Sequence, residues 1–450
     1  MSFEYSKRVA IHLDNSQLWL EFDKELTKLG KVIVPVPHFF THQQIAHMVK
    51  TAGIDTVICA NEAQLLWSKL GFTPVTDNLN HCVLMTRNVI KYPNLPLNTH
   101  KITFTSGTTN EPKGVCLSLQ HLQEVGKSLA QVTNKFQVKK HMCVLPLSVL
   151  LENMAASYAS DLTNIEVVTP SLAELGLSGS SGLDIKKLIG RICHYKPDSL
   201  ILMPQMLKAL IGFLEFQTTD LSFLKFIAVG GAVCSKGLLA KTQQLKLPVF
   251  EGYGISECGS VISLNTHINQ IGHVGNILPH QKVKINSSGE IMTKGHLYLG
   301  YLGEECHKKE WYATGDLGKF NEKNQLQIIG RKKNVIINSF GRNISPDWIE
   351  AELLAINEIH QVVIYGEAKP YLTAICVSNS HVDDIWNSVN QLNKCLPDYA
   401  QVKQIIISDC SFNIENQMLT ASGKNKHENI FKYFNNQLKE IYANSRTHIT

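Results

Sequence analysis

The 450-residue sequence contains no run of about 18 apolar residues, the shortest length that spans a bilayer as a helix. It also lacks long polar, low-complexity or basic tracts, and its formal net charge of +5 is small for its length. Disorder and a nucleic-acid partner are therefore not indicated. The opening residues, Met-Ser-Phe-Glu-Tyr-Ser-Lys-Arg, lack the apolar segment of a secretory signal. Together these absences predict a cytoplasmic protein without an integral membrane segment.

The cysteine spacing of common zinc sites is absent as well. None of the 11 cysteines forms a Cys-x2-Cys pair, and a disulfide framework is not expected in so long a chain. The sequence does have 44% hydrophobic and 18% charged residues, which is typical of a folded globular protein. Its length exceeds that of one compact core, so two or more domains are predicted.

Strand-like and helix-like segments alternate over the first three quarters of the chain. Residues 32–36 and 56–60 are apolar strands, and residues 41–52 between them have the pattern of a helix. This alternation predicts an α/β fold in which parallel sheets are covered by helices.

Two further strands are predicted at 226–229 and from 248, with a helix from about 235 to 245 between them. The first is followed by Gly230, Gly231 and Ala232, and the second by Gly252, Tyr253 and Gly254. In open α/β sheets, ligands bind beyond the carboxyl ends of the strands, and glycine lets them approach the backbone. A ligand site is therefore predicted where these two turns meet.

The pattern then changes to short alternating segments separated by turns, which predict antiparallel strands in a small β-barrel-like part. A domain boundary is predicted after the strand at 327–330. Residues 1–330 would form a large N-terminal domain and residues 331–450 a small α+β domain. Ser345 and Pro346 suit the N-cap and first position of a helix in that small domain.

The most distinctive segment runs from Phe104 to Gly114 and combines four hydroxyls, two glycines and a lysine. Hydroxyls and backbone N–H groups in a turn can cradle phosphate oxygens, and Lys113 can neutralise charge on the outer phosphates. The Gly-x4-Gly-Lys-Ser/Thr spacing of a Walker loop is missing. In isolation, such a string could also be a serine- and threonine-rich surface loop.

This segment resembles the phosphate loop of the adenylate-forming superfamily, which contains acyl-CoA synthetases, luciferases and peptide-synthetase adenylation domains. The family signature reads roughly Thr-Ser-Gly-Thr-Thr-Gly-x-Pro-Lys-Gly, and this chain has Asn110 at a glycine position. Asparagine tolerates positive φ, so the loop can still form. The resemblance implies that ATP is bound by Thr105, Ser106, Gly107, Thr108, Thr109 and Lys113.

Residues 251–257 resemble the Tyr-Gly-x-Thr/Ser-Glu segment of the same family. By this resemblance, Tyr253 stacks on adenine, Ser256 contacts phosphate, and Glu257 holds Mg²⁺, for which a carboxylate is a suitable hard ligand. Further ATP contacts implied by the family are Gly230, Gly231, Ala232, Glu251, Gly252 and Gly254.

Three later segments also resemble the family, in its order. Residues 312–316 match Tyr-x-Thr-Gly-Asp, in which Asp316 would accept both ribose hydroxyls. In the hinge-like string after Ile329, Arg331 would contact ribose or phosphate and Lys333 would be the pivot. Near the C-terminus, Lys424 would bridge the substrate carboxylate and the α-phosphate, where charge builds in the transition state. The predicted catalytic residues are thus Lys424, Glu257 and Lys113.

Residues 145–152 resemble the segment that lines the acid pocket, to which Ser148, Val149 and Gly254 would contribute. Many acyl and aryl ligases have histidine in place of Val149, and amino-acid-activating domains have an aspartate nearby. An ammonium group would be uncompensated against Val149, so an acyl or aryl acid is expected. The segment before Arg8 is shorter than in the family, which predicts a first layer that is incomplete or completed by a partner in a homodimer.

The resemblance implies an AMP-forming acid–thiol ligase of acyl-CoA synthetase type, as in fatty acid metabolism. ATP and Mg²⁺ would activate a small-molecule carboxylic acid to an acyl-adenylate. After rotation of the small domain, the acyl group would pass to CoA or to the phosphopantetheine of an acyl carrier protein. Two alternatives remain open: a luciferase-type enzyme that needs no thiol, and a non-catalytic adenylate-binding or carrier-docking protein.

Overall fold

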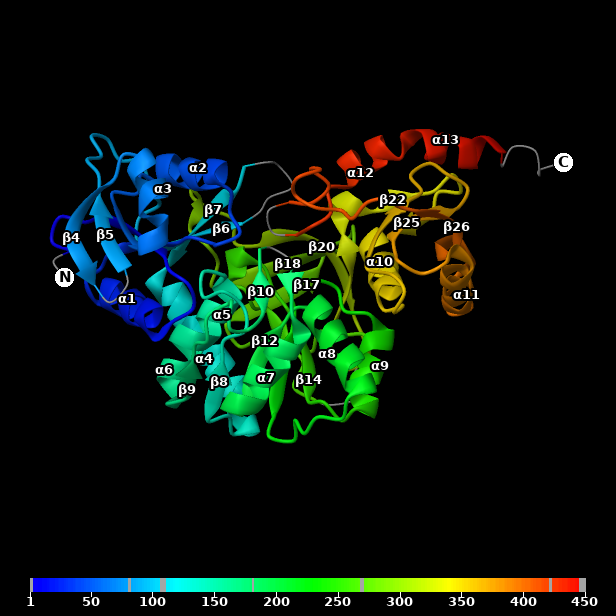
Figure 1. The fold of residues 1–450 in the computed structure, drawn as a ribbon, viewed down its shortest axis with the longest axis horizontal. Coiled ribbons are helices and arrows are strands. Elements are labelled where there is room, and N and C mark those ends of the chain that lie inside the picture. The colour runs from blue at the N-terminus through cyan, green and yellow to red at the C-terminus, as the bar shows by residue number, and fades with distance from the viewer. Residues whose placement is uncertain are drawn as a thin grey trace.

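The computed structural model describes residues 3–79, 82–105, 111–179, 182–267, 271–420 and 423–444. Two large sheets with their helices form the N-terminal part of the molecule, and a smaller domain packs beside them (Figure 1). The described part contains no helix with the length and apolarity that crossing a membrane requires. Ser106, Gly107, Thr108 and Thr109 of the predicted phosphate loop lie outside the described residues.

The first sheet has eight strands, with a parallel centre and antiparallel edges. In sheet order they are β19 (Gly300–Tyr301), β7 (Lys113–Ser118), β6 (Thr99–Thr105), β2 (Val32–Pro35), β1 (Arg8–His12), β3 (Thr56–Ala60), β5 (Cys82–Thr86) and β4 (Thr73–Leu79). The predicted strands at 32–36 and 56–60 are thereby confirmed.

Helices of this chain cover both faces of the first sheet. Helix α1 (Gln17–Lys28) packs on the face of Val9 and Ile11. Helices α2 (His42–Ala52) and α3 (Gln64–Lys69) pack on the opposite face, against Ala10. The helix predicted at 41–52 is confirmed, with Thr41 as its N-cap. The expectation of an incomplete first layer is wrong, because α1, α2 and α3 bury both faces.

The second sheet has seven strands, of which five are parallel. In order they are β16 (Asn276–Ile277), β15 (Ser263–Leu264), β14 (Val249–Tyr253), β13 (Phe226–Val229), β12 (Ser199–Leu202), β8 (Lys140–Met142) and β9 (Glu166–Val168). Strand β13 is as predicted. Strand β14 extends further than predicted, so Gly252 and Tyr253 belong to the strand and pair with β15.

Helices lie on both faces of the second sheet too. Those packed against Ile227 and Val229 are α7 (Ile185–Tyr195), α8 (Pro204–Phe216) and α9 (Lys236–Gln244). Toward the first sheet lie α4 (Leu119–Thr133), α5 (Leu150–Asn153), a π-helical turn (Met154–Ala159) and α6 (Ser160–Thr163). The helix predicted at 235–245 is confirmed as α9, with Ser235 as its N-cap. A small hairpin joins β10 (Leu177–Ser178) and β11 (Gly182–Leu183).

The segment predicted to be β-barrel-like forms an open antiparallel sheet. Its strands, in order, are β17 (Gln281–Ile285), β18 (Glu290–Gly295), β20 (Tyr312–Phe320) and β21 (Leu326–Arg331). Asp316 on β20 pairs in register with Arg331 on β21. Two residues with predicted roles at the nucleotide thus lie on neighbouring strands.

The smaller domain is built on α10 (Pro346–Leu354) and a three-stranded sheet. The sheet consists of β24 (Gln361–Tyr365), β25 (Leu372–Val377) and β26 (Val402–Ile407). The remaining elements are β22 (Ile336–Ile337), β23 (Asn343–Ile344), α11 (Val382–Asn393), α12 (His427–Tyr433) and α13 (Asn435–Asn444). Its two buried clusters draw only on residues from Ile336 onward, so this domain has a core of its own. Ser345 caps α10, as predicted.

Candidate active site

A cavity of 2690 Å³ lies between the smaller domain and the carboxyl ends of β13 and β14. Every predicted site residue that the structure describes lines this cavity. They are Thr105, Lys113, Ser148, Val149, Gly230, Gly231, Ala232, Glu251, Gly252, Tyr253, Gly254, Ser256, Glu257, Asp316, Arg331, Lys333 and Lys424. The structure therefore brings together side chains that span more than 300 positions of the sequence.

The backbone beside β14 leaves no room for a side chain at Gly254. A Cβ added there would lie 2.0 Å from the carbonyl oxygen of Ser260. Gly231, after β13, has a φ of +81°, in the region that favours glycine. Both positions thus depend on glycine, and at both the backbone itself lines the cavity.

Asp316 is a buried carboxylate in the lining of the cavity. Its Oδ2 accepts a hydrogen bond from the Tyr253 hydroxyl at 2.6 Å, and its Oδ1 lies 2.8 Å from Arg331 Nε. Burial raises the pKa of Asp316, and Arg331 and Tyr253 oppose that rise. The Arg331 side chain is half exposed and can turn away, which would leave carboxylate lone pairs for a diol.

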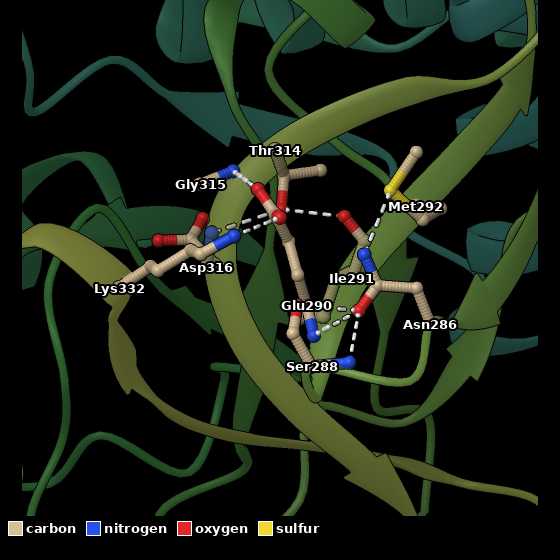
Figure 2. Close-up of polar contacts among 9 residues, drawn as sticks. All are labelled: Asn286, Ser288, Glu290, Ile291, Met292, Thr314, Gly315, Asp316 and Lys332. Carbon is tan, nitrogen blue, oxygen red and sulfur yellow. Dashed lines mark hydrogen bonds and ion pairs between the residues drawn. The ribbon is translucent and has the colours of Figure 1, made fainter.

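A second carboxylate, Glu290, holds the bulged part of β20 that carries Asp316 (Figure 2). Its Oε1 accepts the Gly315 backbone N–H at 3.2 Å, and its Oε2 lies 2.8 Å from Lys332 Nζ. The Thr314 hydroxyl accepts the Asp316 backbone N–H at 3.1 Å and donates to the Ile291 carbonyl at 3.0 Å. Sequence reasoning missed Glu290, whose role depends on the pairing of β18 with β20.

Glu257 lies on a short 3-10 turn at the cavity and accepts a hydrogen bond from the Tyr301 hydroxyl at 2.5 Å. The Tyr312 hydroxyl is 3.2 Å from that of Tyr301. Burial and the charge of Glu257 both raise the pKa of Tyr301, so its hydroxyl remains a donor. One carboxylate beside phosphate oxygens is the usual protein contribution to a Mg²⁺ site, and Glu257 fits that donor set. Tyr301 was not among the predicted residues.

Lys113 lies at the start of β7 and is half exposed. Its Nζ is 3.1 Å from Glu304 Oε1 and 5.0 Å from the centre of the Tyr301 ring. An ion pair this exposed contributes little to stability. Lys113 can therefore exchange Glu304 for phosphate oxygens at small cost.

Lys424 reaches the cavity from the smaller domain, on a tight loop closed by a bridge between Leu419 and Asn425. Although the residue is exposed to the cavity, loss of hydration lowers the pKa of its ammonium. The positive charge of Arg331 lowers it further, while Asp347 and Asp316 raise it. The Lys424 ammonium is therefore influenced by the charges of Asp316 and Arg331, which line the same cavity.

Two polar residues that the sequence did not single out hold the predicted acid-pocket segment. The Asn15 side chain donates to the Leu145 carbonyl at 2.9 Å and accepts the Leu147 N–H at 2.7 Å. Fully buried Glu152 accepts the Leu145 N–H at 2.8 Å and pairs with His141 at 2.8 Å. The sequence offered one signal for this pair, because His141 and Glu152 are charged or titratable residues at the two ends of a mostly apolar stretch.

Ser148 and Glu251 each present a buried oxygen that has no hydrogen-bond partner within the described part of the chain. Burial raises the pKa of Glu251 to about 8, although the Gly272 N–H and the charge of Lys236 oppose that rise. The Glu251 carboxyl is then mostly protonated at neutral pH and can donate a hydrogen bond. Ser148 and Glu251 both belong to the cavity lining, and a buried polar atom without a partner is uncommon in folded proteins.

Two layered sheets and a smaller domain that share a cavity form the arrangement of adenylate-forming folds. Residues 3–315 match the AMP-binding enzyme family, and residues 333–446 match the AMP-binding enzyme C-terminal domain. The chain therefore belongs to the AMP-binding enzyme family.

Two relatives of this chain are named as CoA ligases. Rat long-chain-fatty-acid–CoA ligase 6 is 24% identical over 435 residues, which cover 79% of this chain and 62% of that protein. The 2-succinylbenzoate–CoA ligase of Enterococcus faecalis is 25% identical over 392 residues, covering 83% and 78%. This chain thus spans about three fifths of the length of the rat ligase.

Solved structures share the fold at low sequence identity. The o-succinylbenzoate CoA synthetase of Bacillus subtilis, in complex with its acyl-adenylate intermediate, has a TM-score of 0.72. Sequence identity is 19%, and the match covers 94% of this chain and 87% of that one. The arrangement of the large sheets and the smaller domain is therefore that of adenylate-forming enzymes.

Proposed function

We propose that this protein is an AMP-forming acid–thiol ligase that activates a carboxylic acid with ATP and passes the acyl group to a thiol. The observation that carries the proposal is the shared cavity, which Lys424 of the smaller domain lines together with Asp316 and Glu257 of the large domain. Related proteins are named as CoA ligases, and the Bacillus subtilis synthetase has been solved with ATP and a magnesium ion.

In the first half-reaction, the carboxylate oxygen attacks the α-phosphorus of ATP and pyrophosphate leaves with the electron pair of the broken P–O bond. Lys424 aligns the carboxylate with the α-phosphate and stabilises the charge that develops there. Lys113 holds the leaving pyrophosphate after releasing Glu304. Mg²⁺ held by Glu257 would supply further neutralisation of phosphate charge.

Other residues that line the cavity would bind the nucleotide. Tyr253 would stack on adenine, Asp316 would accept the ribose hydroxyls, and Arg331 would turn from Asp316 toward ribose or phosphate. The further backbone and side-chain contacts proposed for ATP are Thr105, Ser106, Gly107, Thr108, Thr109, Gly230, Gly231, Ala232, Glu251, Gly252, Gly254 and Ser256.

In the second half-reaction, a thiol attacks the carbonyl of the mixed anhydride, AMP leaves, and the thiol proton passes to solvent. We place the boundary between residues 330 and 331, with Lys333 as the pivot about which residues 331–450 rotate between the steps. The acceptor is CoA or a carrier protein's phosphopantetheine. A cytoplasmic location and a homodimer belong to the same proposal.

The acid pocket favours an acyl or aryl acid. The lining contributed by residues 145–159 is apolar apart from Ser148. Glu152 in this segment is already paired with His141, so it is not available to an α-ammonium group. Burying that ammonium beside Val149 would be costly.

Exchange of labelled pyrophosphate into ATP, measured across a panel of acids, tests the proposal and identifies the acid. Thioester formation with CoA, with a carrier protein and without either then identifies the acceptor. Product release that needs no thiol would support a luciferase-type enzyme. Absence of exchange with every acid would favour a non-catalytic adenylate-binding or carrier-docking protein.

Lys424→Ala separates the two half-reactions. We expect pyrophosphate exchange to fall at least about a hundredfold, because the developing charge loses its cation. Thioester formation from supplied acyl-adenylate should change much less. Lys432→Ala, at an exposed lysine of α12, is the control. Equal losses in both steps would contradict the assignment of Lys424 to adenylation.

A further inference from the structure

Lys208 reaches from the large domain to the smaller one. It lies on α8, and its Nζ donates to the carbonyl oxygens of Ile356 and Ile359, each at 2.9 Å. Ile356 and Ile359 follow α10, which ends at Leu354, in the segment that leads to β24. Neither carbonyl belongs to the helix, and the Ile356 carbonyl also accepts the Ile359 backbone N–H at 3.2 Å. The Lys208 amine therefore holds both carbonyls of the turn that follows α10.

A second contact holds the same helix on the large domain. Glu352 of α10 accepts the backbone N–H of Lys236, the first residue of α9, at 3.3 Å. A carboxylate is a favourable partner at a helix N-terminus, which carries positive partial charge. Figure 1 shows α10 beside α8 and α9, so the two contacts act on one interface.

The same helix also supports the loop of Lys424. Glu350 of α10 accepts a hydrogen bond from His427 at 3.0 Å, three residues beyond Lys424. The negative charge of Asp347, also on α10, acts on the Lys424 ammonium. The position of α10 on the large domain therefore sets where Lys424 lies in the cavity.

We propose that Lys208 is a positioning residue for adenylation, holding α10 and thereby Lys424 in the arrangement that serves the first half-reaction. This inference rests on the proposed function. The two hydrogen bonds are broken when the smaller domain rotates, so the contribution of Lys208 belongs to one step. Burial lowers the pKa of Lys208 to about 8, but the amine retains two N–H groups in either protonation state.

Lys208→Met keeps the apolar stem and removes both donors. The expected result is a fall of about tenfold in kcat for pyrophosphate exchange, equivalent to about 1.4 kcal/mol, with an unchanged KM for ATP. Thioester formation from supplied acyl-adenylate should be unaffected, and Lys208→Arg should restore exchange. Lys241→Met is the matched control, because Lys241 on neighbouring α9 pairs with Glu215 inside the large domain at 2.9 Å.

Hydrogen exchange of the backbone amides at 346–360, measured on the full chain without substrate, gives a readout that does not need activity. Lys208→Met should speed this exchange, and Lys241→Met should not. If no acid is activated by the unaltered protein, the proposed function fails while this measurement still tests the contact. Unchanged amide exchange, or equal losses in both half-reactions, would overturn the role of Lys208.

Discussion

At the scale of single residues, the Tyr301 hydroxyl is the contact that best tests the role of Glu257. It donates to the carboxylate that would hold Mg²⁺. Without it, the carboxylate loses its fixed orientation, and such supporting contacts commonly change metal affinity about tenfold. Tyr301→Phe should therefore raise the Mg²⁺ concentration for half-maximal pyrophosphate exchange by about that factor.

Tyr312→Phe is the control for this substitution. It removes the hydroxyl 3.2 Å from Tyr301 but leaves the bond from Tyr301 to Glu257 in place. Its Mg²⁺ dependence should stay close to that of the unaltered protein. If both variants raised the required Mg²⁺ concentration equally, the hydrogen bond from Tyr301 to Glu257 would not be the cause of the effect.

The sequence predicted the residues whose chemistry is encoded in local strings, and missed those whose partners are distant. Asp316, Glu257 and Lys424 each lie within a recognisable string, and all three line the cavity. Tyr301 is 44 positions from Glu257, and Lys208 is 148 positions from Ile356. Nothing local marks such residues, because their roles arise only when sheets and domains pack.

At the scale of elements, the sequence located helices well and strand ends less well. Thr41 and Ser235 cap their helices through side-chain oxygens, a signal carried within a few residues. The end of β14 was placed too early because glycine suggests a turn, whereas pairing with β15 continues the strand through Tyr253. Sheet pairing is a tertiary interaction and outweighs local preference.

A buried ion pair ties β6 to α1 and predicts a large loss of stability when it is broken. Lys101 is fully buried, and its Nζ lies 2.8 Å from Asp23 Oδ1 and 2.6 Å from Asn153 Oδ1. Asp23→Ala would leave the ammonium without its counterion, and should lower the free energy of unfolding by about 3–5 kcal/mol. Urea unfolding measures this loss.

The double variant Asp23→Leu with Lys101→Met is the comparison for that measurement. It removes both charges and fills the space, so its loss should be clearly smaller than that of Asp23→Ala. A double variant as unstable as Asp23→Ala would show that packing, and not the unpaired charge, sets the cost.

The contact between α10 and α12 predicts a pH-dependent stability. Burial lowers the pKa of His427, but the hydrogen bond and charge of Glu350, together with the charge of Asp347, raise it by more, so the net pKa is raised above its usual value. A raised pKa stabilises the fold fully below the unfolded pKa, and this contribution is lost as pH rises through the folded value. His427→Gln should therefore cost most near about pH 6 and least above about pH 8.

Urea unfolding at these two pH values measures the dependence. Glu350→Gln keeps an acceptor for the Ile364 N–H, which the Glu350 carboxylate accepts at 2.9 Å, and removes the charge. It should reduce the pH dependence of the His427 contribution, and the charge of Asp347 would account for what remains. A cost of His427→Gln that is the same at both pH values would contradict the ion pair.

At the scale of the whole molecule, the two domains meet closely at Gly330, immediately before the proposed hinge. A Cβ added to Gly330 would lie 2.2 Å from Ser345 Oγ and 2.8 Å from Ser345 Cβ. Ser345 is buried and caps α10, so Gly330→Ala must displace the start of that helix. Because α10 leads into the turn that Lys208 contacts and also supports Lys424, this displacement acts on the whole interface.

Gly330→Ala should lower pyrophosphate exchange by up to about a hundredfold, since a misplacement of about 1 Å can cost that much. Thioester formation from supplied acyl-adenylate should be lowered less, because rotation separates these surfaces. Gly190→Ala in α7, where an added Cβ would meet nothing within 4 Å, should leave both steps unchanged. If Gly330→Ala slowed only thioester formation, the close contact at Ser345 would belong to the second step, and the structure would represent the thiol-accepting arrangement.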